Sequence, residues 1–273
     1  MNLTDTLLHL AKNPCANYDV AEIALHIARD EFPHLDVEAY LGELDAMAHE
    51  MRCYLRGNLS AQLKGMCRYL FHEMGFRGNV GNYYDPFNSY LNIVLESRTG
   101  IPITLSAVAM AIGRRAGLEI TGVGLPGHFV AKVSDGKEEI LFDPFHGGRQ
   151  IQPQDCETLV MQITGMNFRA TPDKLQAIPL GSLVQRMLSN LKAVYLRQSD
   201  FHRGIRVIER LQQLNPRNPL HDRDLGACCL RNGQPGKAID YLQAYLYKTP
   251  NAEDTETVEE LLNQAQDEVA KWN

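Results

Sequence analysis

The sequence has 273 residues, of which 44% are apolar and 22% are charged, and its formal net charge is −6. This composition is typical of a globular protein with enough chain for one large domain or two smaller ones. The negative charge gives no general attraction to nucleic acid or anionic lipid, so we expect no nucleic-acid or membrane partner. Residues 1–13 are too polar for a signal peptide, and the longest apolar run, residues 101–113, is too short to span a membrane.

The cysteines indicate a protein with reduced thiols. No two have the C-x-x-C spacing of a zinc or redox site, and one pair is adjacent in sequence. A cytoplasmic protein keeps its thiols in this state, so we expect a cytoplasmic location. The six positions are Cys15, Cys53, Cys67, Cys156, Cys228 and Cys229.

The N-terminal region is predicted to be helical. Apolar residues recur at spacings of three and four in residues 16–32 and 35–55, and Pro33 separates these two helices. A Gly/Asn-rich loop then follows in residues 76–87, where the aromatic side chains are expected to anchor the loop to the core. An alternative is that Tyr83 or Asp85 faces a ligand.

A buried helix is predicted to begin near Pro102 and to end near Gly117. A thiol at its start would be activated, because free backbone N–H groups and the helix dipole stabilise a thiolate. The side chains available there are the hydroxyls of Thr104 and Ser106. Each would need the His128 ring within hydrogen-bond reach to act as a nucleophile. The alternative is that both simply bond the backbone near the helix start.

A hairpin is predicted to bring a histidine to an aspartate. Residues 128–133 and 138–143 have the pattern of strands, and a loop containing Asp-Gly joins them. If Val133 faces Glu138, then His128 lies directly across from Asp143. The carboxylate would then orient the imidazole, as in a nucleophile, base and orienter triad. The alternative is a polar pair that satisfies itself at the end of a hairpin.

The predicted fold class is α+β. A strand in residues 117–125 and the hairpin form a small antiparallel sheet that packs on the helices, which favours neither a barrel nor a sandwich. A short helix in residues 156–165 follows, among prolines. We place the domain boundary after it, which gives a helical plus α+β domain in residues 1–180 and an all-α repeat domain in residues 181–273.

The C-terminal region repeats with a period of 34 residues, which is the tetratricopeptide period. Small residues at Gly204, Gly226 and Ala238 would let paired helices approach closely. We expect helices at 183–198, 201–214, 219–232 and 235–248, with a capping helix at 254–271. A protein or peptide partner is expected on these repeats, and the alternative is that they only pack. The pairs that show the period are Leu191 with Leu225, Ile208 with Leu242, and Pro216 with Pro250.

These motifs resemble a known core. The order of helix start, GLPGHFVAKV and LFDPFHGGR resembles the transglutaminase-like core of the papain-type cysteine hydrolases. More closely, NSYLNIVLESRTGIPITLS with PGHF and FDPF is similar to a bacterial family of regulators of the SirB type. The resemblance implies a degenerate transglutaminase-like core followed by tetratricopeptide repeats. It places the histidine of the superfamily on His128, the aspartate on Asp143, and the position of the nucleophilic cysteine on Pro102.

The function expected from this pattern is protein interaction or regulation by a domain that has lost thiol catalysis. The alternative is an amide hydrolase or acyltransferase in which His128 and Asp143 activate a water, Thr104 or Ser106. A metal site made of the same pair with His146 is a third possibility. The loop position of His146 and the absence of a fourth ligand in the sequence count against it, so we expect no metal and no cofactor.

Overall fold

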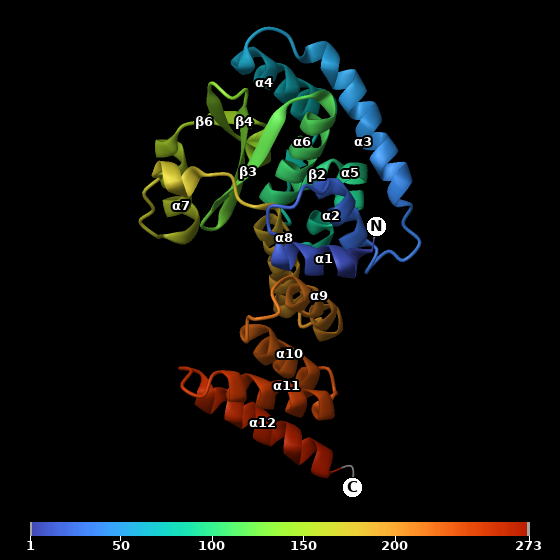
Figure 1. Cartoon of the computed structure of the whole chain (residues 1–273), viewed down its shortest axis with the longest axis vertical. Coiled ribbons are helices and arrows are strands. Elements are labelled where there is room, and N and C mark those ends of the chain that lie inside the picture. Colours follow the sequence, from blue (N-terminus) through green and yellow to red (C-terminus); the bar gives the residue numbers. More distant parts are fainter. Residues whose placement is uncertain (1, 272–273) are drawn as a thin grey trace. The chain divides into compact units, whose positions relative to one another are not determined.

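The computed structural model describes residues 2–271, which form two compact units (Figure 1). One unit is Cys15–Met187. The other joins Asn2–Pro14 to the residues from Leu188 onward, so that the division falls within helix α8 (Leu180–Arg197). The sequence-based boundary at residue 180 stays a prediction. Among the described residues, no helix combines the length and the apolar character that crossing a membrane requires.

The first unit opens with helices that begin at side-chain caps. Asp19, Asp36 and Asn58 each accept a hydrogen bond from a backbone N–H in the first turn of the helix that follows, which satisfies a donor that has no partner within the helix. The two N-terminal helices predicted on either side of Pro33 are confirmed. The helices of this part are α2 (Val20–Ala28), α3 (Val37–Met51), α4 (Leu59–Cys67), which continues as a π-helix over Arg68–Glu73, and α5 (Leu91–Ser97).

Helix α6 (Pro102–Ala116) is the central element of this unit. Most of its residues are buried, because it packs on β3 and β4 of the sheet and also on α2, α3 and α5 (Figure 1). Pro102 occupies its first turn, where the missing N–H costs no helical hydrogen bond. Gly117 ends it with a φ of +92°, a left-handed conformation that suits glycine. The predicted bounds of this buried helix are confirmed.

The predicted antiparallel sheet is also confirmed, and the fold class is α+β. Four strands pair in the order β3-β4-β5-β6, each antiparallel to its neighbour. A two-residue parallel ladder of β1 (Arg77–Gly78) and β2 (Thr99–Gly100) lies apart from them. Helix α7 (Pro153–Thr164) follows the sheet. The strands are β3 (Glu119–Leu125), β4 (His128–Ser134), β5 (Glu139–Asp143) and β6 (Arg149–Ile151).

The prediction that His128 lies directly across from Asp143 is wrong. In the β4–β5 hairpin, Ser134 pairs with Glu139, and the same register continued along the strands places Asp143 opposite Val130. The two residues of interest are therefore diagonal neighbours. Because side chains alternate faces with a period of two, a difference of two residues keeps both on the same face of the sheet.

The turn explains the difference in register. The loop begins one residue later than expected, at Asp135, whose Oδ1 accepts hydrogen bonds from the N–H groups of Lys137 (2.9 Å) and Glu138 (3.0 Å). Gly136 adopts a φ of +82° and donates its N–H to Ser134 Oγ at 3.1 Å. These local bonds within the loop, rather than the strand pattern, select the register.

The second unit contains the repeats. The five helices predicted there are confirmed, with ends that shift by at most three residues. Helix α1 (Leu3–Lys12), which the sequence analysis did not predict, packs against α9. Helix α10 packs on α9 and α11, and α12 packs on α11 (Figure 1). Besides α8, the repeat helices are α9 (Phe201–Leu214), α10 (Leu220–Arg231), α11 (Pro235–Lys248) and α12 (Thr255–Ala270).

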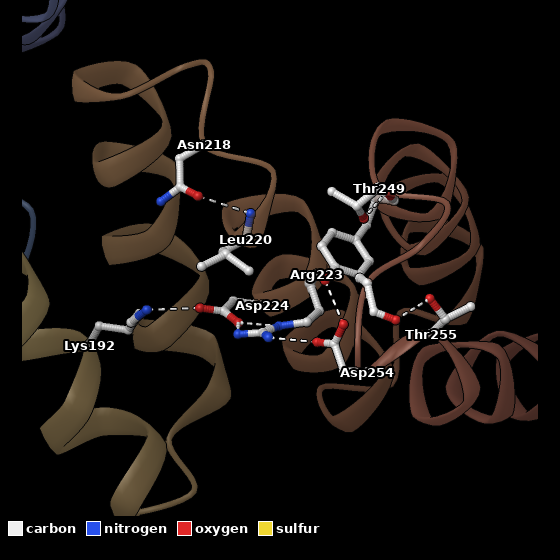
Figure 2. A network of polar contacts seen from close by, with 10 residues as sticks. Lys192, Asn218, Leu220, Arg223, Asp224, Thr249, Asp254 and Thr255 are labelled. Atoms are coloured by element: carbon white, nitrogen blue, oxygen red, sulfur yellow. Dashed lines mark hydrogen bonds and ion pairs between the residues drawn. The ribbon is translucent and has the colours of Figure 1, made fainter.

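The repeats owe their contact to small residues and to a polar network. A Cβ at Gly226 would lie 2.6 Å from Leu242 Cγ, so only glycine allows α10 and α11 to approach this closely. Figure 2 shows the network. Asp224 accepts from Lys192 at 2.8 Å and from Arg223 at 2.9 Å, and Arg223 reaches Asp254 at 2.7 Å. These ion pairs tie α8 and α10 to the start of α12.

We expect Gly226→Ala to destabilise the repeat unit. The added methyl group would collide with Leu242, and overpacking costs about 1–3 kcal/mol, whereas better helix propensity returns about 1 kcal/mol. Urea unfolding followed by circular dichroism measures the difference. The matched control is Gly236→Ala in α11, where a Cβ meets nothing within 4 Å and stability should not fall. Equal stability of the two variants would contradict the packing argument.

Candidate functional site

The site is organised by Asp143, the last residue of β5. Its Oδ1 accepts hydrogen bonds from the N–H groups of Phe145 (3.0 Å) and His146 (3.3 Å), and so caps the short 3-10 helix Pro144–His146. The chain then turns back, and the N–H of Gly148 donates to the Asp143 carbonyl at 2.8 Å. The carboxylate is therefore fixed by its own loop, and Oδ2 is left to face the neighbouring strand.

His128 meets that oxygen from the start of β4. Its Nε2 lies 2.9 Å from Asp143 Oδ2, and the side chains are 3% and 2% exposed. A carboxylate only accepts hydrogen bonds, so Nε2 carries the proton of this contact. Nδ1 of His128 has no hydrogen bond to any of the described residues. The structure thus brings the predicted histidine and aspartate together and leaves one ring nitrogen uncommitted.

A third side chain completes the cluster. His146 Nδ1 donates to the same oxygen, Asp143 Oδ2, at 2.8 Å, and its side chain is 47% exposed. The rings of His128 and His146 lie 5.7 Å apart with a tilt of 32°. From the sequence, His146 was considered only as a metal ligand in a loop. The signal for its position was the Asp-Pro-Phe-His spacing, which lets an aspartate cap the turn that carries the histidine.

The charge of the cluster is set at Asp143. Burial by itself raises the pKa of this carboxyl, but the hydrogen bonds from His128 and His146 outweigh burial and hold the pKa below the ordinary value of 3.8. The carboxylate is therefore ionised at neutral pH. Two imidazoles and two backbone N–H groups compensate its charge.

Aromatic rings surround the two histidines. Phe145 packs edge-on against His128 at 5.9 Å, and Tyr83 packs against Phe145 at 6.1 Å. Burial raises the pKa of Tyr83. Asp85, the other loop residue considered for a ligand, instead accepts from the N–H of Phe87 at 3.0 Å and caps a short 3-10 helix. In this structure Tyr83 anchors the loop, as the sequence analysis expected for its aromatic residues.

Arg186 holds the backbone of His128, a role that was not predicted from the sequence. Its Nη2 donates to the carbonyls of Leu125 (2.6 Å) and His128 (2.5 Å), and its guanidinium lies 5.4 Å from the centre of the Phe129 ring. Burial lowers the pKa of Arg186. By joining both ends of the tight β3–β4 turn, Arg186 is a positioning residue for His128.

The predicted hydroxyls point to main-chain carbonyls. Ser106 Oγ donates to the Pro102 carbonyl at 2.8 Å, and Thr104 Oγ1 donates to the Asn88 carbonyl at 2.8 Å while it accepts from the N–H of Ile101 at 3.1 Å. Both residues are buried. The structure gives neither hydroxyl a hydrogen bond to His128. Pro102 itself is buried in the first turn of α6.

The thiol of Cys67 lies near the loop of the site. Cys67 Sγ donates to the carbonyl of Gly148 at 3.3 Å, and a Cβ on Gly148 would approach that sulfur to 2.5 Å. Burial raises the pKa of the Cys67 thiol to about 12. This sulfur is therefore a neutral donor, the opposite of the thiolate that a cysteine hydrolase requires.

Two hollows of this unit lie away from the cluster. One of about 680 Å³ is lined by residues from Cys15 to Val20, the end of α6 and the start of β3. Another of about 550 Å³ lies between β5, β6 and the residues that follow α7. Neither includes His128, Asp143 or His146. The candidate site is a compact cluster at a loop rather than the floor of one of these hollows.

The unit has a buried helix that begins beside a sheet, and two neighbouring strands of that sheet supply a histidine and an aspartate. This is the combination that the resemblance to the transglutaminase-like core predicted. Residues 38–189 match the transglutaminase-like superfamily, and residues 191–263 match the tetratricopeptide repeat. A UPF0162 protein of Xylella fastidiosa is 33% identical over 244 residues, covering 86% of this chain and 85% of that protein. The chain belongs to the transglutaminase-like superfamily and, more narrowly, to the UPF0162 proteins.

Two further similarities were found. Human F-box only protein 21 is 31% identical over 147 residues, which are 51% of this chain and 22% of that much longer protein. Among solved structures, a crystal structure of menin that describes its binding site for the Mixed Lineage Leukemia protein aligns with a TM-score of 0.41 and 12% identity, covering 94% of this chain and 73% of menin. The family matches confirm the core followed by repeats that the sequence motifs predicted.

We expect Asp143→Asn to change the response of stability to acid. Because the folded-state pKa of Asp143 lies below its ordinary value, the carboxylate contributes stability that is fully present above that value and is lost as the pH falls through the folded-state pKa. The variant should be about 1–3 kcal/mol less stable at neutral pH, since buried donors lose their acceptor. Its stability should also fall less steeply below about pH 4.

Urea unfolding at a series of pH values measures both effects. The exposed Asp173 supplies the control variant Asp173→Asn, whose curve should follow that of the unmodified protein. Identical slopes in acid for the protein and for Asp143→Asn would show that the buried carboxylate does not govern this range.

We expect Cys67 to resist alkylation. Its thiol is buried and protonated, whereas Cys15 and Cys53 are exposed, and only a thiolate attacks iodoacetamide at a useful rate. Mass spectrometry of peptides after a short exposure at neutral pH should find the two exposed cysteines modified well before Cys67. Comparable labelling of Cys67 in folded protein would reveal an activated sulfur beside the site.

Proposed function

We propose that this protein is a transglutaminase-like domain that performs no thiol catalysis, joined to repeats that bind a segment of a protein partner and so serve in interaction or regulation. One observation carries the first part. Pro102 occupies the first turn of α6, which the family resemblance assigns to the nucleophilic cysteine, and proline has no group that attacks a carbonyl.

The groups that could replace a cysteine are engaged in other contacts. The hydroxyls of Thr104 and Ser106 donate to backbone carbonyls, and the Cys67 thiol donates to a third carbonyl. A serine or threonine hydroxyl becomes nucleophilic when an adjacent base takes its proton. These three donors instead complete the hydrogen bonding of buried backbone, which supports a structural role for each.

The repeats support the second part of the proposal. Stacked tetratricopeptide hairpins form extended surfaces, and such proteins use them for binding. Here the ion pairs among Lys192, Arg223, Asp224 and Asp254 hold neighbouring helices in fixed positions, so the surface is pre-arranged. Tyr247 on α11 is 88% exposed, and exposed tyrosines are enriched at protein interfaces.

We also propose a cytoplasmic location. All six cysteines are free thiols, and the cytoplasm keeps thiols reduced. This proposal rests on the cysteines alone.

A second candidate function is hydrolysis of an amide by an activated water, or transfer of its acyl group to an amine through a non-cysteine nucleophile. The specific observation in its favour is the geometry of His128, whose Nε2 is held by Asp143 at 2.9 Å while Nδ1 has no hydrogen bond to the described residues. A neutral ring held in this way presents a lone pair on Nδ1, as a general base requires.

A peptide-display selection against the full chain tests the proposal and separates the two candidates. Selected peptides should bind with the same affinity to the protein and to His128→Ala, and should be recovered intact after long incubation. Hydrogen exchange should show protection by the peptide in residues 188–271.

Three outcomes would count against the proposal. Cleavage of the peptide, or its transfer to an amine, that disappears in His128→Ala would establish the second candidate. Protection confined to residues 15–187 would remove the repeats as the binding surface. A selection that yields no peptide above background would leave the interaction role without support, and the proposal would fail.

A further inference from the structure

We infer that His128, Asp143 and His146 form a binding site for one divalent transition-metal ion of the Zn²⁺ type, with three protein ligands and an open position for water. This inference goes beyond the proposed function, because it assigns the cluster a ligand whether or not the repeats bind a peptide. From the sequence we expected no metal, and the geometry of the loop is the reason to revise that expectation.

The separations of the ligand atoms fit an ion. One nitrogen from each histidine and one oxygen of Asp143 all lie within 4.8 Å of one another. The two nitrogen–oxygen distances are 2.9 Å and 2.8 Å. A zinc ion has bonds of about 2.0–2.2 Å, which at tetrahedral angles place neighbouring ligand atoms about 3.3–3.6 Å apart. Both rings therefore have to move back from Oδ2 by about half an ångström to seat the ion.

The ligands are held in place by contacts that do not involve the ion. Asp143 Oδ1 is occupied by two backbone N–H groups, so that Oδ2 alone is presented to both rings. The glycines at 147 and 148 have φ values of +72° and +74°, which close the loop behind His146. Arg186 fixes the backbone of His128. Such pre-arranged ligands avoid most of the ordering cost of binding.

The chemistry of the donor set selects the class of metal. Two imidazole nitrogens and one carboxylate oxygen suit zinc, iron and related transition metals, whereas Mg²⁺ and Ca²⁺ take oxygen ligands. Three protein ligands with an open position are the arrangement of catalytic rather than structural zinc sites.

The protons on the two rings can be accounted for when the ion binds, and the ion has a route into the site. Each ring donates an N–H to Asp143, and on binding the ion each of these nitrogens gives up its proton to the other ring nitrogen or to solvent. The side chain of His146 is 47% exposed, against 3% for His128 and 2% for Asp143. The ion therefore enters from the His146 side, and in the bound state it takes the place of the two donated hydrogens.

Cobalt binding by protein purified without a tag tests the inference. The exposed thiols of Cys15 and Cys53 are replaced by serine, because they would bind transition metals themselves. We expect one Co²⁺ per chain with visible absorption bands, displacement of Co²⁺ by Zn²⁺, and no competition from Mg²⁺. In His146→Ala the affinity should fall by about tenfold or more, and in His72→Ala, an exposed histidine of the same unit, it should not change.

The inference is overturned if binding does not saturate at one ion, or if His146→Ala binds as tightly as His72→Ala. His146→Ala removes a half-exposed ring, so circular dichroism should show an unchanged fold. Should Asp143→Asn fail to fold, His146→Ala alone decides the question. The metal result is independent of the proposed function, because peptide binding by the repeats and its insensitivity to His128→Ala are measured without the ion.

Discussion

The carboxylate of Asp143 accepts four hydrogen bonds in a position where its side chain is 2% exposed. An ionised group removed from water is costly unless partners compensate it. Here one oxygen takes two backbone N–H groups of its own loop and the other takes two imidazoles. The charge of Asp143 therefore fixes the positions of the end of β5, the start of the next turn, and the side chains of His128 and His146.

The need of the buried carboxylate for hydrogen-bond donors gives the His128–Asp143 contact a second interpretation. In a cysteine hydrolase the aspartate orients the histidine for the benefit of the nucleophile. In this chain the dependence also runs the other way, because the buried carboxylate needs the donor that His128 supplies. Removing the ring would leave a buried charge with one donor fewer, at a cost of a few kcal/mol. The pair would thus persist for reasons of stability alone, and its presence does not by itself indicate turnover.

Local signals in the sequence predicted the elements well. The 34-residue period located the four helices of the two repeats, and proline before and glycine after the apolar run located α6. These features act within a few residues or repeat regularly, so one sequence contains them. The prediction of the hairpin register was wrong because a single Asx turn at Asp135 determined the pairing more strongly than the strand pattern did. His128 and Asp143 still met, since an error of two residues preserves the face of the sheet.

The parts that escaped prediction depend on long-range contacts. Arg186 lies 58 positions from the histidine whose carbonyl it binds, and Cys67 lies 81 positions from Gly148. Nothing in the neighbourhood of either residue marks its partner. Helix α1 was also missed, and its buried face packs on α9, almost two hundred residues away.

At Pro102, the position that we propose for the lost cysteine, folding and chemistry have different requirements. A cysteine in the first turn of a buried helix is valuable as a thiolate, because the helix dipole and free N–H groups stabilise negative charge. Proline has no charge for the helix dipole to stabilise. Its fixed φ nevertheless suits the first turn, where its missing N–H would make no helical hydrogen bond. Once an attacking sulfur is not needed, folding therefore favours proline over a group whose charge must be buried. The neighbouring hydroxyls fit the same reasoning: neither has a hydrogen bond to His128, and each buried hydroxyl satisfies its own donor by bonding a backbone carbonyl.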